Sequence, residues 1–143
     1  LQRLHCPQPR VDLGLALSGI ASSAIDVSDG LAADLGHILK QSSVGACIES
    51  GCLPVSEAMQ ALASRESAQQ YMLGSGDDYE LCFTVPPDKV AELEQVSRNL
   101  GINCTRIGII EQQSGLRLHS LNGATGEIGS SGYDHFRDNT ATE

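Results

Sequence analysis

Aromatic side chains are scarce in this sequence: there is no Trp, and the 143 residues include only 3 Tyr and 2 Phe. Surfaces on which bases or sugar rings stack need aromatic rings, so such surfaces are not expected here. Basic residues are also in the minority, because 9 Lys plus Arg stand against 18 Asp plus Glu, a formal net charge of −9. A surface of that sign repels phosphate backbones, and a nucleic-acid partner is therefore not expected.

Long apolar runs are missing too. The longest, near residues 13–20, is interrupted by glycine and serine and falls short of the roughly 20 residues that span a bilayer. We therefore do not expect this chain to be a membrane protein. No basic segment precedes this run and the first residue is Leu1, which argues against a secretion signal. We expect the chain to be a piece of a longer protein.

Cysteine pairs with the spacing of zinc or redox sites are absent. The odd number of cysteines also argues against a disulfide framework; they are Cys6, Cys47, Cys52, Cys82 and Cys104. We interpret them as small buried or half-buried apolar residues of a protein in the reducing cytoplasm. The histidines lack zinc-ligand spacing as well, and His37 needs no role beyond the surface of a helix.

The composition is that of a globular protein, with 41% apolar and 19% charged residues. We expect one domain over residues 1–143. It consists of an extended arm (1–10), a region of sheet and helices (11–128), and a hinge with a polar tail (129–143).

Hydrophobic periodicity predicts alternating strands and helices. Strands are expected at 22–28, 46–49, 79–85, 104–110, 116–121 and 127–128, and helices at 29–41, 55–63, 67–73 and 87–100. Gly101 follows the last helix, where a left-handed residue is common. Segments 104–110 and 116–121 are expected to form a hairpin-like pair. The alternation indicates the α/β or α+β class, a sheet covered by helices.

The first candidate site is Ile25-Asp26-Val27-Ser28-Asp29-Gly30, where a strand is expected to turn directly into a helix. Alternation along the strand would put Asp26 and Ser28 on one face, with Asp29 three residues after Asp26. Two carboxylates beside a helix N-terminus suit Mg²⁺ carrying phosphates. The alternative is that Ser28 or Asp29 simply caps the helix. Capping leaves Asp26 unexplained, because an unpaired charge inside an apolar strand is costly.

The second candidate is Gly74-Ser75-Gly76-Asp77-Asp78-Tyr79-Glu80-Leu81, two glycines followed by crowded acids. Glycines permit close backbone approach, and neighbouring acids repel one another unless a cation joins them. The alternative is a solvated turn, for which Gly and Asp are ordinary residues. Neither a P-loop nor a dinucleotide-binding fingerprint is present.

The third candidate is the tail Gly132-Tyr133-Asp134-His135-Phe136. An aromatic ring there could stack on a ligand ring or a cation, or it could pin the chain end to the core.

Taken in order, these segments resemble the C-terminal domain of the thiamine-monophosphate kinase family. The resemblance also includes Pro7-Gln8-Pro9-Arg10 and Ile107-Gly108 and covers nearly the whole chain. The paired D-x-S-D-G-L and G-[ED]-D-Y-E-L signatures are specific when they occur together. The wider superfamily includes aminoimidazole ribonucleotide synthetase, and the resemblance implies a mixed sheet flanked by helices. Another ATP-dependent member of that superfamily, or a non-catalytic acidic interaction module, is the alternative.

The resemblance implies a cytoplasmic enzyme that uses ATP and Mg²⁺ to phosphorylate thiamine monophosphate to thiamine diphosphate. By motif, Asp26 and Asp29 would bind Mg²⁺, Ser28 would contact ATP, and Asp77 and Tyr133 would contact the thiamine substrate. No residue is implied as a general acid or base.

Two departures from the family pattern concern the second motif: Asp77 replaces the usual Glu, and Ser75 stands where glycine is common. The family's N-terminal domain supplies further metal ligands, much of the nucleotide site and the contact of a homodimer. That domain is absent from this chain, so the fragment alone is expected to be inactive.

Overall fold

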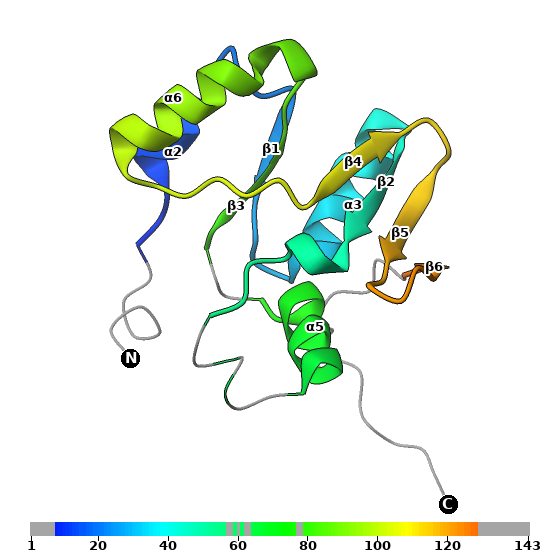
Figure 1. Cartoon of the computed structure of the whole chain (residues 1–143). Helices are drawn as coiled ribbons and strands as arrows, with labels where there is room; N and C mark the ends of the chain where they lie inside the picture. Colours follow the sequence, from blue (N-terminus) through cyan, green and yellow to red (C-terminus); the bar gives the residue numbers. More distant parts are fainter. Residues whose placement is uncertain (1–7, 57–58, 60, 62–63, 77–78, 129–143) are drawn as a thin grey trace, which may run out of the picture.

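The computed structural model describes residues 8–56, 59, 61, 64–76 and 79–128, which form two β-sheets with helices packed on them (Figure 1). The strands are β1 (Ser23–Asp26), β2 (Gly45–Glu49), β3 (Leu81–Thr84), β4 (Gly108–Glu111), β5 (Gly115–His119) and β6 (Thr125–Glu127). The helices are α2 (Val11–Ala16), α3 (Leu31–Ser42), α5 (Arg65–Gly74) and α6 (Val90–Leu100), with short 3-10 turns η1 (Ser50–Cys52) and η2 (Pro87–Lys89). The expected mixture of helices and sheet is confirmed.

The smaller sheet consists of β1 paired antiparallel with β3, in a register that runs from Ser23 opposite Thr84 to Asp26 opposite Leu81. The hydroxyls of Ser23 and Thr84 share a hydrogen bond of 2.7 Å at one end of the ladder. The other end lies next to both acidic motifs of the sequence. This pairing therefore decides where the candidate site forms.

The larger sheet has the order β4-β2-β5-β6. Strand β2 is antiparallel to β4 and parallel to β5, and β6 lies at the edge of the sheet, overlapping the strand expected at 127–128 only at Glu127. The predicted hairpin between the segments at 104–110 and 116–121 is therefore wrong, because β2 lies between the strands they form. The physical reason is burial: Ala46 and Ile48 of β2 are 3% and 1% exposed, and a central position hydrogen-bonds this apolar strand on both sides.

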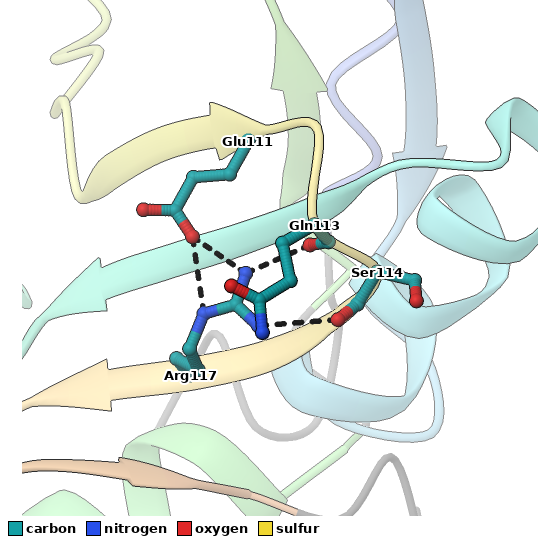
Figure 2. Close-up of polar contacts among 4 residues, drawn as sticks. All are labelled: Glu111, Gln113, Ser114 and Arg117. Atoms are coloured by element: carbon teal, nitrogen blue, oxygen red, sulfur yellow. Dashed lines mark hydrogen bonds and ion pairs between the residues drawn. The ribbon is translucent and has the colours of Figure 1, made fainter.

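Arg117 of β5 reaches across β2 to the end of β4 (Figure 2). Its Nε and Nη2 donate to one carboxylate oxygen of Glu111 at 3.0 and 2.5 Å, and its guanidinium also donates to the carbonyls of Gln113 and Ser114 at 2.8 and 3.1 Å. Gly45 lets the same turn close tightly, since a Cβ there would lie 1.9 Å from the Gln113 carbonyl oxygen. The cation thus joins the two strands on either side of β2.

Helix α3 provides one wall of the core and packs against β1, β3, β5 and α5. Its buried face meets the apolar side chains of the larger sheet. The core cluster consists of Val27, Ala32, Leu35, Ile38, Leu39, Ala46, Ile48, Leu53, Cys82, Leu116 and Leu118. Aliphatic residues dominate it, as the shortage of aromatic residues requires.

The expected helix at 87–100 is confirmed as η2 followed by α6, and it ends at Gly101 with a φ of 62°. Helix α6 packs against α2 above the β1–β3 ladder (Figure 1). Helix α2 begins at Val11, immediately after the expected arm, and the sequence analysis predicted no helix there. Of the arm, residues 8–10 are described and are neither helix nor strand.

Two further helices and the burial of the cysteines were also predicted from the sequence. The expected helix at 67–73 is confirmed as part of α5. The one at 55–63 falls largely outside the described residues; of those described, Val55 and Ser56 are not helical, whereas Met59 and Ala61 are. Cys52 is exposed, so the prediction of buried or half-buried cysteines is wrong for that residue, which lies in an exposed turn. Within the described part of the chain, no helix has the length and apolar character needed to cross a bilayer.

Candidate functional site

The first motif forms the connection between β1 and α3. Strand β1 ends at Asp26 and helix α3 begins at Leu31, so four residues intervene and the strand does not turn directly into the helix. The N-cap of α3 is Gly30, and no side chain caps the helix. The alternative in which Ser28 or Asp29 caps the helix is therefore wrong; Gly30 adopts a φ of 115°, which only glycine reaches without strain.

Backbone hydrogen bonds join this connection to the second motif. The Val27 N–H donates to the Glu80 carbonyl at 2.8 Å, and the Tyr79 N–H donates to the Val27 carbonyl at 3.1 Å. These bonds extend the β1–β3 ladder beyond the last regular pair. They place the two acidic signatures next to each other, although about fifty residues separate them in sequence.

Glycines make that contact close. A Cβ on Gly76 would lie 2.1 Å from the Ser28 carbonyl oxygen, and a Cβ on Gly30 would lie 3.0 Å from the Gly74 carbonyl carbon. The distance at Gly76 is incompatible with a larger side chain, so this position requires glycine for backbone approach, whereas at Gly30 the contact is tight and the positive φ is what requires glycine. The expectation of close approach at the second motif is confirmed at Gly76, and its partner is the loop of the first motif.

The carboxylates of the first motif face solvent. Asp26 and Asp29 are both exposed and Ser28 is half-buried. The premise that Asp26 is buried inside an apolar strand is wrong, because it is the last residue of β1 and lies on that strand's exposed face. An exposed carboxylate avoids the desolvation cost and remains free to bind a cation.

A third carboxylate, that of Asp34 in α3, lies close to Asp29 of the first motif. Single ligand atoms of Asp29, Asp34 and His37 all lie within 4.8 Å of one another; Asp26 is not a member of this group. Sequence reasoning missed Asp34. The available signal was an acid within an otherwise apolar helix face, flanked by Ala32, Ala33 and Leu35.

The donors at this site fit a hard divalent cation. Exposed carboxylate oxygens beside the start of a helix are the ligands that Mg²⁺ prefers when it also binds phosphate oxygens and water. Of the residues proposed to hold the ion, Asp29 lies in the group with Asp34, and Asp26 lies at the start of the same connection. His37 is exposed, as expected, but it lies near the acids rather than apart from them.

Arg10 ties the beginning of the described chain to the second motif. Its Nε and Nη2 each donate to a different carboxylate oxygen of Glu80, both at 2.8 Å. The hydrogen bond to Glu80 raises the pKa of Arg10 above its usual value, so the guanidinium stays charged. Arg10 thus contacts the same motif that packs on Ser28.

The two residues predicted to contact the thiamine substrate, Asp77 and Tyr133, lie outside the described residues. The pinning of the tail to the core lies outside them too. Two cavities of about 580 and 430 Å³ lie elsewhere, one at the C-terminal end of α3 beside Lys40 and Glu127, the other beside His119 and Glu49. Neither is lined by Asp26, Ser28 or Asp29.

Known proteins resemble this chain in sequence and in structure. The family described as AIR synthase related protein, C-terminal domain, matches residues 7–120. This chain belongs to that family. The matched range includes the connection between β1 and α3, the glycine contacts and Arg10, so the features described above lie within the family's own domain.

Several thiamine-monophosphate kinases are similar to this chain. That of Haemophilus influenzae is 44% identical over 142 residues, covering 96% of this chain and 43% of the relative. The crystal structure of thiamine-monophosphate kinase from Stenotrophomonas maltophilia is 45% identical with a TM-score of 0.78, covering 82% of this chain and 37% of that one. The structure of AaThiL complexed with AMPPCP and TMP is 29% identical with a TM-score of 0.74, covering 94% and 40%.

The chain therefore spans about two fifths of the length of these relatives.

Proposed function

We propose that this family member is the C-terminal domain of a thiamine-monophosphate kinase. The enzyme would transfer the γ-phosphate of ATP to thiamine monophosphate and release thiamine diphosphate and ADP. The observation that carries the proposal is the backbone contact between the two signatures, in which Gly76 packs on the Ser28 carbonyl. The similarity to kinases of that name, and to a structure holding AMPPCP and TMP, supports it.

In this proposal the first motif binds the nucleotide. Asp26 and Asp29 hold Mg²⁺, and the Ser28 hydroxyl contacts ATP. Bound Mg²⁺ neutralises charge on the phosphate oxygens. The second motif and the tail bind the other substrate, with Asp77 and Tyr133 contacting the cationic thiamine.

The chain's own contribution is positioning. In phosphoryl transfer a substrate phosphate oxygen attacks the γ-phosphorus while the bond to the β-γ bridging oxygen breaks, and no general base on the protein is required. The close contact between the loops would hold nucleotide and acceptor at a fixed separation. The proposal also includes an N-terminal domain that completes the enzyme, assembly of the complete enzyme as a homodimer, and a cytoplasmic location. The chain alone would be inactive.

The test is a coupled assay of the complete enzyme, this chain with its N-terminal domain, comparing thiamine monophosphate with aminoimidazole precursors. We expect ADP release only with thiamine monophosphate. Release with an aminoimidazole precursor instead would assign another activity of the same family, and no release with either would favour a non-catalytic acidic module.

The metal and substrate assignments have separate tests. Asp26→Asn and Asp29→Asn should each abolish turnover while preserving the fold, whereas Asp88→Asn, an exposed acid on η2, should not. Near-normal turnover in both variants would remove the metal assignment. Tyr133→Ala should raise the KM for thiamine monophosphate more than that for ATP, and the reverse would contradict the substrate role.

A further inference from the structure

Asp34 is a buried carboxylate in a helix whose other buried residues are apolar. It is 3% exposed, and among the described residues it is the one charged side chain that is buried. A charge so placed is costly unless hydrogen bonds or a counter-ion compensate it. The hydrogen bonds that compensate this charge come from the connection between β1 and α3, which the proposed function assigns to nucleotide binding.

One oxygen of Asp34 accepts two hydrogen bonds from consecutive backbone amides. Its Oδ2 lies 2.9 Å from the Ser28 nitrogen and 3.1 Å from the Asp29 nitrogen. Hydrogen bonds to an ionised acceptor are roughly twice as strong as those between neutral groups. Together they fix the peptide groups from which the Ser28 and Asp29 side chains extend.

Backbone hydrogen bonds to the second motif hold Val27 at the start of the connection, and Asp34 supplies the side-chain acceptor for the next two amides. Gly30 follows these amides in a conformation that a flexible glycine provides, and no side chain caps α3. Asp34 instead reaches back from inside the helix, so the loop is held by the element that carries the core. The geometry of the loop is thereby tied to the position of α3.

We propose that Asp34 is a positioning residue: it fixes the Ser28–Asp29 backbone so that these side chains point at the magnesium-bound nucleotide. The inference rests on the proposed function for its purpose, but not for its geometry. It assigns Asp34 the role of acceptor for two amides, not that of a metal ligand.

The geometric part is tested by amide hydrogen exchange of the 143-residue chain, measured by NMR. In the wild type, exchange at Ser28 and Asp29 should be at least tenfold slower than at Asn122, which lies in an exposed turn. Equally fast exchange would overturn the proposal even if no variant folds. Asp34→Leu should accelerate exchange at both amides at least tenfold, and Asp34→Asn, which keeps an acceptor oxygen, less than threefold. Unchanged exchange in Asp34→Leu would also overturn it.

The functional part is tested in the complete enzyme. Asp34→Leu should raise the Mg²⁺ concentration for half-maximal rate and the KM for ATP at least tenfold, with the KM for thiamine monophosphate changed less than twofold. Asp34→Asn should stay within threefold of wild type, and Asp88→Leu is the control for loss of an acid.

The outcomes separate the two proposals. Wild-type enzyme without kinase activity would refute the proposed function and leave the exchange measurement valid. An active wild type with an unchanged Mg²⁺ requirement in Asp34→Leu would refute the positioning role. Equal losses in the Asn and Leu variants would do so too, because the charge rather than the acceptor would then be required.

Discussion

Arg10 and Glu80 form a bidentate ion pair, with two N···O distances of 2.8 Å, between the start of the described chain and the motif that precedes β3. The side chain of Arg10 is 23% exposed and that of Glu80 is 43% exposed. Planar fork-to-fork geometry favours such a pair over a single surface contact. The pair therefore fixes where the chain enters the domain relative to the second motif.

The Arg10–Glu80 pair should stabilise the fold measurably. In a double-mutant cycle of Arg10→Ala and Glu80→Ala, we expect a coupling energy of about 1 kcal/mol, obtained from urea unfolding. The cycle is needed because Glu80 has other interactions as well. The control is Arg98–Glu94 on α6, an exposed pair at 3.8 Å, which should couple by less than about 0.5 kcal/mol. Equal couplings would contradict a special role for the bidentate pair.

The close approach at Gly76 should tolerate no side chain. Gly76→Ala places a Cβ 2.1 Å from the Ser28 carbonyl oxygen, so one loop must move, and we expect a loss of about 2 kcal/mol in unfolding free energy. Gly74→Ala is the matched control, because a Cβ there meets nothing within 4 Å. That variant should unfold within about 0.5 kcal/mol of wild type or be slightly more stable. Similar behaviour of the two variants would show that the loops are not in contact.

Arg117 should contribute more to stability than an exposed arginine. Arg117→Met removes the donors that satisfy the Glu111 carboxylate and two carbonyls, which should cost about 2 kcal/mol of unfolding free energy. Arg106→Met, at an exposed position, is the control and should cost less than about 0.5 kcal/mol. A small effect at Arg117 would mean that water replaces the guanidinium without loss.

Cys82 should make stability depend on alkaline pH. Burial, together with the negative charge of Asp34, raises the pKa of Cys82 from 9.0 to about 11. Because the folded thiol keeps its proton where the unfolded one loses it, the stabilisation is complete below pH 9 and declines as pH rises toward 11. The decline should reach about 2 kcal/mol.

Comparing wild type with Cys82→Ala by urea unfolding at pH 8 and pH 11 isolates that contribution from those of other titrating groups. The exposed Cys52 provides the control, since Cys52→Ala should lower stability equally at both pH values. A wild-type pH dependence that matches that of Cys82→Ala would refute the assignment.

Local signals in the sequence predicted much of the fold. The spacing of Val90, Leu93, Val96 and Leu100, with Gly101 after it, predicted α6 and its end correctly. The apolar segments at 46–49 and 79–85 correspond to β2 and β3. These features depend on periodicity and on glycine at a helix end, and both can be recognised within a dozen residues.

Features that depend on distant contacts were not predicted. Segments 104–110 and 116–121 are close in sequence and suggested a hairpin. Strand β2 lies between them instead, because a central position in the sheet buries this apolar strand and pairs it with a strand on each side. Helix α3 begins two residues later than expected because Gly30, not Asp29, has the conformation of the N-cap. Asp34 escaped notice because its partners are backbone amides, which the sequence does not reveal, and the acid on an apolar helix face was the signal that remained.

The pairing of β1 with β3 joins Ser23 to Thr84, residues 61 positions apart. Closing so long a loop costs conformational entropy that local contacts do not offset, so this ladder is expected to form slowly. During synthesis, the Asp26–Gly30 connection would leave the ribosome long before Gly76 does. The candidate site can therefore assemble only after the middle of the chain has been translated.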